Sequence, residues 1–360
     1  MPPERVVVAM SGGVDSSVAA ALLKEAGYEV IGVTMEIWPA DKEAFGGCCG
    51  IEAAEDAKRV AYKLDIPHYV MNFRDIFAQR VIDYFCVEYS LGRTPNPCIR
   101  CNQYIKFGAL LQRIRELDAD FMATGHYARI EQSPNGYRLL KAVDPTKDQS
   151  YFLYTLGQRE LKHLLLPVGN FNKAQVRKLA VELGLPTANR RESQDICFTP
   201  DNDYRSFIAR YIPLKPGDIV DTNDKVLGKH KGLALYTVGQ HKGLGLNSSE
   251  RLFVLRLDAA SNRLVVGTED ELFSNRLNAS QLSWVSGEAP SGNITAKIRY
   301  KSPEVAVQLT LRDGMAEVLF HEPQRAITPG QAVVFYQGET VLGGGIIEEG
   351  ELKRGEASLI

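Results

Sequence analysis

The chain has 360 residues, of which 44% are hydrophobic and 24% charged, and its formal net charge is −2. This composition is typical of a globular protein, and the length predicts two or three domains. No apolar run reaches the length of a membrane span and the first residues do not resemble a signal peptide, so we expect a cytoplasmic protein without a membrane partner. The near-neutral charge neither indicates nor excludes a nucleic-acid partner. Six cysteines in a reducing compartment favour catalysis or metal binding over a disulfide framework.

A strand, a glycine turn and a helix are predicted in succession at the start of the chain. The apolar run Val6–Met10 breaks at Ser11-Gly12-Gly13, and a helix is predicted over Ser16–Ala26. Glycine lets the backbone approach an anion, and a helix N-terminus presents N–H groups and the positive end of its dipole. Serine hydroxyls add donors, and Asp15 can hold a magnesium ion or orient the loop. The stretch predicts a phosphate-binding loop, but it lacks the lysine of an ordinary P-loop.

Strand-like and helix-like segments alternate through the first half of the chain. They are predicted at Tyr28–Met35, Glu52–Leu64, His68–Asn72, Ile76–Leu91, Lys106–Leu117, Phe121–Thr124 and Lys173–Leu183. This alternation predicts an α/β fold with a doubly wound parallel sheet, whose ligands bind at the carboxyl ends of the strands. The glycine turn lies at that edge.

Short alternating strands separated by glycine-rich turns follow after about Asp201. They are predicted at Asp218–Asp221, Leu235–Thr237, Phe253–Asp258, Arg263–Gly267, Ile294–Lys301, Val305–Leu311, Ala316–Phe320 and Gln331–Tyr336. We expect domains at residues 1–200, 201–275 and 276–360, the second mostly β and the third a small barrel or sandwich. The alternation places Lys297, Arg299 and Lys301 on one face of a strand, which predicts a basic surface.

Two prolines and an asparagine stiffen a predicted loop that carries Cys98 and Cys101. Their C-x-x-C spacing suits half of a zinc site, a redox pair or two ligands of an iron–sulfur cluster. A zinc site needs a second pair, and only Cys48-Cys49 is left for it, because Cys86 falls in a helical apolar pattern as a packing residue. A structural zinc site is therefore disfavoured.

A further cysteine, Cys197, lies between Ile196 and Phe198. By itself this setting is typical of a small buried hydrophobic residue. The polar neighbours Gln194 and Asp195 are instead expected at a functional site.

Several longer motifs occur together, in order, along the chain. They are Ser-Gly-Gly-Val-Asp-Ser at 11–16, Gly-Arg-Thr-Pro-Asn-Pro-Cys-Ile-Arg-Cys-Asn at 92–102, Ala-Thr-Gly-His-Tyr-Ala-Arg at 123–129, Lys-Asp-Gln-Ser-Tyr-Phe-Leu at 147–153, Ser-Gln-Asp-Ile-Cys-Phe at 193–198 and the Gly-Lys-His-rich stretch at 228–245. From Val6 to about Gly345 the chain resembles the tRNA-specific 2-thiouridylases (the MnmA/TrmU family) of the PP-loop ATP pyrophosphatase superfamily. The resemblance implies an N-terminal ATP-binding catalytic domain, a β-rich adaptor and a C-terminal β-barrel that contacts tRNA.

The resemblance also implies a reaction. Members of this family adenylate O2 of the wobble uridine (U34) of tRNA with ATP, release pyrophosphate, and displace AMP with sulfur from a cysteine persulfide to give 2-thiouridine. Cys101 would be the nucleophile and Cys197 the persulfide carrier, and the two would form a transient Cys101–Cys197 disulfide that an external reductant reopens. Basic Arg100, Arg190 and Arg191 would lower the pKa of these thiols if they lie near them. ATP and Mg²⁺ are the implied cofactors, and the implied partners are the anticodon arm of tRNAs for Lys, Glu and Gln and a sulfur-donor protein.

Binding residues are likewise implied by the resemblance. Those for ATP are Ala9, Met10, Ser11, Gly12, Gly13, Val14, Asp15, Ser16, Met35 and Gly125. Those for the target base and tRNA are Asn96, Pro97, Cys98, His126, Lys147, Asp148, Gln149, Arg299, Tyr300 and Gln331. The basic runs Lys229-His230-Lys231 and His241-Lys242 suit either a solvated face or contact with the RNA backbone.

The chain departs from many members of the family at Cys98, where they have aspartate. A third cysteine permits an alternative in which Cys98, Cys101 and Cys197 hold an iron–sulfur cluster. No function is predicted for Cys48-Cys49. Rival interpretations are an amidotransferase or synthetase that adenylates a small molecule, and a non-catalytic RNA-binding module.

Overall fold

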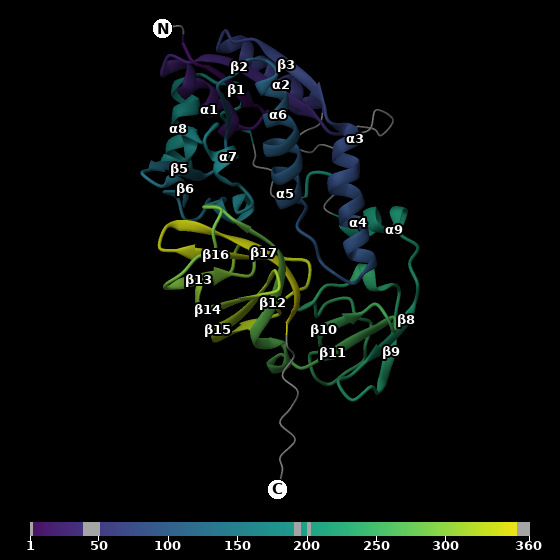
Figure 1. Ribbon diagram of the computed structural model, residues 1–360. Coiled ribbons are helices and arrows are strands. Elements are labelled where there is room, and N and C mark those ends of the chain that lie inside the picture. The colour runs from purple at the N-terminus through teal and green to yellow at the C-terminus, as the bar shows by residue number, and fades with distance from the viewer. Residues whose placement is uncertain (1–2, 39–50, 191–195, 200–202, 351–360) are drawn as a thin grey trace.

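The computed structural model describes residues 3–38, 51–190, 196–199 and 203–350. Cys48-Cys49, Arg191, Gln194 and Asp195 lie outside these ranges. An α/β unit stands above two β units, with the barrel on one side and the central β unit on the other (Figure 1). Within the described ranges no helix has both the length and the apolar character that crossing a membrane requires.

A five-stranded parallel sheet forms the centre of the α/β unit. Its order is β3-β2-β1-β4-β7, with β1 Arg5–Ala9, β2 Glu29–Glu36, β3 His68–Asn72, β4 Phe121–Thr124 and β7 Leu164–Leu165. Successive side chains of β1 point to opposite faces, so Val6 and Val8 belong to one core cluster and Val7 to another. Both faces are therefore buried, as expected for a doubly wound sheet.

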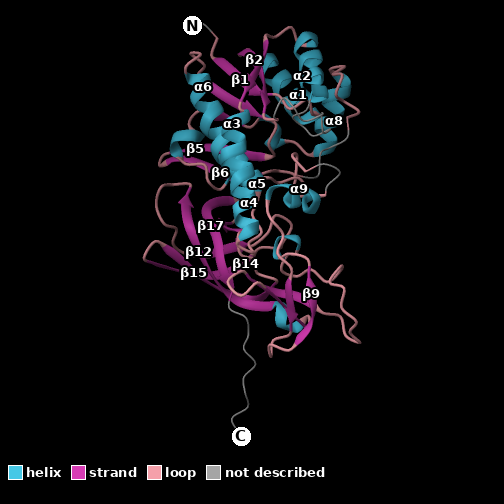
Figure 2. Cartoon of the chain, turned by 90° about the vertical axis from the view of Figure 1, so that its right-hand side faces the viewer, coloured by secondary structure: helices cyan, strands magenta, loops and turns pink. Residues whose placement is uncertain are grey.

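Helices cover the two faces of this sheet (Figure 2). One face packs on α1 Val14–Glu25, α2 Ile51–Lys63 and α8 Lys173–Glu182. The other packs on α3 Arg74–Phe77, η1 Ala78–Ile82, α4 Asp83–Ser90, α5 Pro97–Arg100, η2 Cys101–Leu110 and α6 Leu111–Arg115. The segments η1 and η2 are wound as π-helix, which is often found at functional sites. The predicted α/β fold class is confirmed.

A hairpin in the α/β half of the chain joins the C-terminal barrel. Strands β5 Ala128–Ser133 and β6 Gly136–Lys141 pair with each other, and β6 pairs with β17 Thr340–Gly350. Short helices connect this region, with Ser150–Leu153 and Pro167–Asn170 in 3₁₀ form and α7 over Gln158–Leu161. This hairpin is not predicted from the sequence. It gives the α/β unit and the barrel a shared sheet.

The central unit is a four-stranded sheet preceded by α9 Tyr204–Tyr211. Its order is β10-β11-β8-β9, with β8 Gly217–Val220, β9 Val226–His230, β10 Phe253–Asp258 and β11 Arg263–Gly267. The strand predicted at Leu235–Thr237 is wrong, because Leu233–Leu235 forms a 3₁₀ turn closed by the Leu235 N–H on the carbonyl of Gly232. A second 3₁₀ turn, Asp270–Leu272, leads to the barrel.

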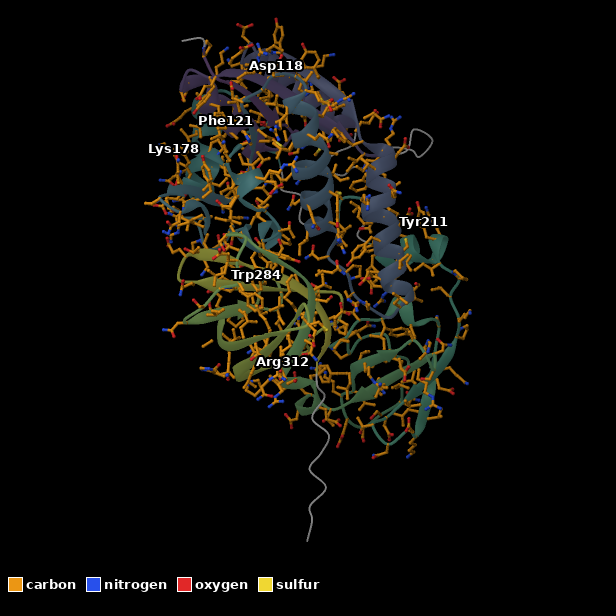
Figure 3. The ribbon with its side chains drawn as sticks, viewed as in Figure 1. Asp118, Phe121, Lys178, Tyr211, Trp284 and Arg312 are labelled. Carbon is orange, nitrogen blue, oxygen red and sulfur yellow. The ribbon has the colours of Figure 1, made fainter. Side chains whose placement is uncertain are left out.

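Six strands close into the C-terminal barrel. They are β12 Phe273–Trp284, β13 Ile294–Lys297, β14 Val305–Arg312, β15 Met315–Arg325, β16 Ala332–Gln337 and β17, in the order β12-β15-β14-β13-β16-β17 with β12 also paired to β17. Closure leaves no free edge and confirms the barrel. Trp284 lies at the end of β12 inside this unit (Figure 3).

The predicted basic strand face on the barrel is wrong. Strand β13 ends at Lys297, so Arg299 and Lys301 follow in a turn and do not share its face. Arg299 is half-buried and donates hydrogen bonds from Nη2 to the carbonyl oxygens of Arg325 (2.6 Å) and Ala326. Burial, followed by the nearby charge of Arg325, lowers the pKa of this guanidinium. Its side chain therefore ties two barrel turns together.

Candidate active site

The glycine turn lies at the carboxyl end of the central strand β1. Gly12 adopts φ = 70°, and a Cβ on it would lie 2.3 Å from the carbonyl oxygen of Ala53 on α2. Only glycine suits both the positive φ and this close approach. The neighbouring strand β2 is equally tight, because a Cβ on Gly32 would lie 2.6 Å from Sδ of Met10. The turn is therefore held between α2 and the sheet, with little room for rearrangement.

Serine side chains shape the start of α1. The Ser16 and Ser17 hydroxyls donate to the carbonyl oxygen of Gly13 at 3.2 and 2.8 Å, and the Ser11 N–H donates to Ser16 Oγ at 3.2 Å. Gly13, the N-cap residue, supplies no side-chain cap. The first N–H groups of a helix have no partner within the helix, so this end of α1 is suited to an anion.

Asp15, in the first turn of α1, accepts hydrogen bonds from two residues that sequence reasoning did not single out. Lys173 Nζ lies 2.7 and 2.8 Å from its two carboxylate oxygens, and the Tyr127 hydroxyl donates to Oδ1 at 2.8 Å. Tyr127 falls within the motif at 123–129, and Lys173 is the first residue of the helix predicted there. Neither position by itself indicates a contact with the loop. The Lys173 contact arises because α8 packs against α1, and Tyr127 reaches Asp15 from the turn after β4.

The remaining predicted ATP residues line the same edge of the sheet. A Cβ on Gly125, just after β4, would lie 2.5 Å from the Ser16 nitrogen and 2.6 Å from the Asp15 carbonyl carbon. Met10 and Met35 are buried, at 2% and 8% exposure, as core residues beneath the edge. The structure therefore brings the glycine turn, the start of α1 and Gly125 together, whereas Met10 and Met35 belong to core clusters on opposite faces of the sheet.

Cys98 and Cys101 lie at the start of a helix and not in the loop that the prolines favour. The Asn96 side chain caps this helix by accepting from the N–H groups of Cys98 (3.1 Å) and Ile99 (3.4 Å), and Pro97 occupies the first helical position. Both features are ordinary helix-start signals. The cap fixes the direction in which this turn presents its thiols.

The described cysteines differ in exposure, and none of them is in a disulfide. Cys98 is exposed, whereas Cys101, Cys197 and Cys86 are partly buried and pack against one core cluster. Burial raises the pKa of the Cys86 thiol to about 11, as expected for an inert packing residue. Phe198 anchors the Cys197 segment through ring contacts with Phe77 and Phe85, at 5.9 and 5.1 Å between centroids. Cys197 and Cys101 thus share one core although they lie far apart in sequence.

The iron–sulfur alternative finds no preformed site. Among the described residues, which include Cys98, Cys101 and Cys197, no three His, Cys, Asp or Glu side chains are grouped so that they could hold a metal ion. The described cysteines likewise provide no zinc site.

Arg100 links the cysteine helix to the barrel. Its guanidinium carbon lies 3.9 Å from the centroid of the Tyr84 ring, and its nitrogens donate to Tyr104 Oη at 3.0 Å and to Gln281 Oε1 on β12 at 2.9 Å. The side chain is buried in these contacts. In the sequence analysis Arg100 is a candidate for lowering a thiol pKa. The contacts that the structure shows for Arg100 connect the cysteine helix to strand β12 of the barrel.

The segment before the cysteines is held by the barrel as well. Arg93 forms ion pairs with Glu88 (2.7 Å) and with Glu348 on β17. The Thr94 N–H donates to the Pro329 carbonyl at 2.8 Å, and Gln331 Nε2 donates to the Thr94 carbonyl at 2.7 Å. The cysteine helix therefore starts from a segment that the barrel fixes on both sides.

Several predicted tRNA residues hold the fold around the site. His126 is buried, lies 2.7 Å from the Thr124 hydroxyl and 3.5 Å from Lys106 Nζ, and has a pKa well below its usual value because of burial and then the Lys106 charge. The Asp148 carboxylate accepts from the Ala142 N–H at 2.9 Å and from the Ser150 hydroxyl at 2.9 Å. These side chains shape the loops that follow β4 and β6.

Other residues of this set are more accessible. Lys147 and Gln149 are partly buried, and Gln149 Oε1 accepts from the Tyr127 N–H at 3.0 Å. Tyr300 stacks on Phe152, 4.6 Å between centroids. Of the two basic runs in the central unit, His230 is buried, whereas the exposed residues are Lys229, Lys231 and Lys242.

Comparison with known proteins agrees with this three-part architecture. Residues 4–201 match the family described as "tRNA methyl transferase HUP domain", residues 205–268 the "tRNA methyl transferase PRC-barrel domain", and residues 274–347 the "Aminomethyltransferase beta-barrel domain". Curated relatives include proteins from Clostridium perfringens (50% identical, covering 97% of this chain and 99% of that protein), Moorella thermoacetica (53%, 95% and 99%) and Geotalea uraniireducens (54%, 96% and 95%). Each is named tRNA-specific 2-thiouridylase MnmA.

Solved structures resemble the chain only weakly. A predicted tRNA methyltransferase subunit from Methanocaldococcus jannaschii is 22% identical at a TM-score of 0.31, covering 50% of this chain and 76% of that one. A 4-thiouridine synthetase bound to RNA and ATP is 16% identical at a TM-score of 0.34, covering 58% and 50%. Likeness at this level carries no argument about the site.

The parallel sheet, the glycine turn at its edge and the C-terminal barrel define an enzyme of the nucleotide-using PP-loop class. With relatives of this identity over nearly its full length, the chain belongs to the tRNA-specific 2-thiouridylase family.

Proposed function

We propose that the protein uses ATP to replace O2 of a tRNA uridine with sulfur, at the wobble position U34. The observation that supports this proposal is that two cysteine segments far apart in sequence pack against one core cluster, one of them hydrogen-bonded to the barrel, in a chain whose α1 start is suited to an anion. Activation of an oxygen and delivery of sulfur need a nucleotide and a thiol within reach of one base. Family membership supports the same reaction.

In the first step, the phosphates of ATP rest at the start of α1 and the uridine O2 attacks the α-phosphorus. The bond between the α-phosphorus and pyrophosphate breaks, and the N–H groups at the start of α1 stabilise the negative charge of the departing pyrophosphate. The walls of the proposed phosphate site are Ser11, Gly12, Gly13 and Gly125. The adenine of ATP is proposed to lie toward Met35. A Mg²⁺ ion bound with ATP would neutralise phosphate charge.

In the second step, the terminal sulfur of a Cys197 persulfide attacks C2 of the adenylated base and AMP leaves. The Cys101 thiolate then attacks Sγ of Cys197, which breaks the sulfur–sulfur bond, releases 2-thiouridine and forms the Cys101–Cys197 disulfide. A thiol reductant returns both cysteines to the reduced state. The base must enter flipped out of its stack, beside Asn96, Pro97 and Cys98.

The tRNA and the sulfur source are the partners of this proposal. Lys147, Gln149, Tyr300 and Gln331 are proposed to face the anticodon arm, and His126, Asp148 and Arg299 to hold the loops that do so. The substrates tRNA-Lys, tRNA-Glu and tRNA-Gln, a sulfur-donor protein, the cytoplasmic location and the domain limits at residues 200 and 275 stay predictions.

A thiolation assay with cysteine variants tests this proposal. Wild type, Cys101→Ser, Cys197→Ser and Cys86→Ser are incubated with ATP, Mg²⁺, a sulfur donor and unmodified tRNA, and 2-thiouridine is measured. We expect loss in the first two variants and retention in Cys86→Ser, because Cys86 is a packing residue with a high pKa. Undiminished thiolation by Cys197→Ser would refute the persulfide assignment.

Pyrophosphate release, measured with the same reagents, distinguishes the proposed enzyme from a synthetase that adenylates a small molecule. A synthetase that adenylates a small molecule would release pyrophosphate without tRNA, whereas the proposed reaction requires tRNA for it. A non-catalytic RNA-binding module would release none.

A further inference from the structure

We propose that Lys173 is the phosphate-binding lysine that the loop itself lacks. Its ammonium group, oriented by Asp15, contacts the phosphates of ATP and then the departing pyrophosphate. This inference rests on the proposed use of ATP and specifies which side chain supplies positive charge at that site.

The start of α8 holds Lys173 rigidly. Asn172 is the N-cap of the helix. Its side-chain oxygen accepts from the Gln175 N–H at 2.9 Å, and the Asn172 N–H donates to the side-chain oxygen of Gln175 at 2.8 Å. The Lys173 N–H itself donates to Asp144 Oδ2 at 2.9 Å. The start of α8 is thus capped by side chains of the chain, in contrast to the start of α1.

The side chain of Lys173 is directed at the first turn of α1. Its ammonium lies 2.7 and 2.8 Å from the two Asp15 oxygens, and only 11% of the side chain is exposed. Lysine is seldom buried unless it is paired, and holding it still costs rotamer entropy. On the same helix Lys178 is 76% exposed and makes an ordinary surface pair with Glu182 at 3.6 Å (Figure 3). The burial is therefore specific to the position that faces the first turn of α1.

Charge balance explains why a lysine is needed there. ATP and pyrophosphate are polyanions, and the acidic residue in the first turn of α1 is Asp15. A carboxylate beside the phosphates would repel them, so a cation on Asp15 removes that repulsion and attracts the anion. Lysine at such a site acts as a point charge, as it does in ordinary P-loops.

Tyr127 completes the arrangement. Its hydroxyl donates to Asp15 Oδ1 at 2.8 Å, and its ring centroid lies 5.6 Å from Lys173 Nζ. The phenol therefore fixes the carboxylate that fixes the lysine. Asp15 then orients a cationic side chain, a second function beside the magnesium ligation considered from the sequence.

An opposite arrangement makes a different prediction. If Lys173 only neutralised Asp15, its removal would strengthen pyrophosphate binding in Mg²⁺, and in an Asp15→Asn background, where no carboxylate repels the anion, its removal would leave metal-free binding unchanged. If Lys173 binds phosphate, its removal weakens metal-free binding of pyrophosphate in both backgrounds.

The experiment is calorimetric titration of the full-length protein with inorganic pyrophosphate, in EDTA and in Mg²⁺. The variants are Lys173→Met, Lys173→Arg, Tyr127→Phe, Asp15→Asn, the double variant Asp15→Asn/Lys173→Met and the matched control Lys178→Met. Lys173→Met is expected to lose about ten- to a hundredfold in affinity in EDTA, the range for a hydrogen bond to a charged group. Lys173→Arg should retain more affinity than Lys173→Met, Tyr127→Phe should lie between wild type and Lys173→Met, and Lys178→Met should match wild type.

Unchanged or tighter metal-free binding by Lys173→Met relative to wild type, or by Asp15→Asn/Lys173→Met relative to Asp15→Asn, would overturn the inference. If Lys173→Met does not fold, as judged by its circular dichroism, Lys173→Arg and Tyr127→Phe carry the test, and wild-type affinity in both overturns it. Failure of wild type to bind either pyrophosphate or ATP would instead refute the proposed function.

Discussion

Replacement of Gly125 by alanine tests whether close contact between the β4 edge and the start of α1 is required for nucleotide binding. The added Cβ would lie 2.5 Å from the Ser16 nitrogen and 2.6 Å from the Asp15 carbonyl carbon. Carbon contacts are optimal at about 3.5–4.0 Å, so the two backbones must separate by about 1 Å. Gly125 is not among the residues with positive φ, so the effect is steric and involves no backbone strain.

The expected cost follows from that displacement. Overpacking of a tight interior costs about 1–3 kcal/mol, and we expect a loss of stability in that range. The first turn of α1 carries the N–H groups proposed for the phosphates, so a shift of this size should also weaken ATP binding by about tenfold or more. Urea unfolding measures the stability, and calorimetric titration measures the affinity for ATP.

A second glycine of the same unit supplies the control. Gly157 has φ = −108°, and a Cβ there would meet only Glu160 Oε2 at 3.3 Å, the end of a side chain that can move. Gly157→Ala should leave ATP binding unchanged. Wild-type ATP affinity in folded Gly125→Ala would refute the reasoning, because the start of α1 would then tolerate displacement.

Three further predictions concern the residues around the cysteines. Glu348→Gln should lower stability at pH 7 by about 1 kcal/mol, since the Arg93 pair is only partly buried. Burial raises the pKa of Glu348, but hydrogen bonds from Arg93 and Ser280 outweigh burial, so the pKa in the folded protein lies below the unfolded value of 4.5. The Glu348 carboxylate therefore stabilises the fold above pH 4.5, and this stabilisation is lost as the pH falls below that value. Urea unfolding should show that the free energy of unfolding decreases less between pH 7 and pH 4 in the variant than in wild type. Equal decreases would contradict a stabilising ion pair. His126→Gln should reduce the fall of stability between pH 7 and pH 5.5, by up to about 1.4 kcal/mol per pH unit, because only the unfolded chain binds this proton below pH 6.5; an unchanged slope would show that His126 is protonated in the fold. Cys98→Asp should keep thiolation activity, and anaerobically purified wild type should contain no iron or sulfide above the level of the variant. Loss of both activity and iron in the variant would favour the cluster mechanism instead.

Much of the α/β unit follows from local pattern. The run Val6–Met10, the turn at Gly12 and the helix after it are encoded within a few residues, so their interpretation needs no long-range contact. The same holds for β3 His68–Asn72 and β4 Phe121–Thr124, which lie where the sequence predicts them. Local pattern misleads where signals compete. The prolines around Asn96 favour a loop, yet the Asn96 side-chain cap and Pro97 at the first helical position start a helix.

Residue type and short spacing predict the class of fold, the glycine turn before α1 and, through resemblance, the cysteines of interest. The side chains that contact this turn and the start of α1 follow instead from packing between distant elements. Lys173 meets Asp15 across 158 positions, and Arg93 meets Glu348 across 255, so no local periodicity can reveal either pair. It also removed Arg299 from a predicted strand face, because the end of β13 depends on partner strands and not on alternation within it. Such contacts arise only when separate elements pack, and they set the charge around the proposed nucleotide site and hold the segment before the cysteines.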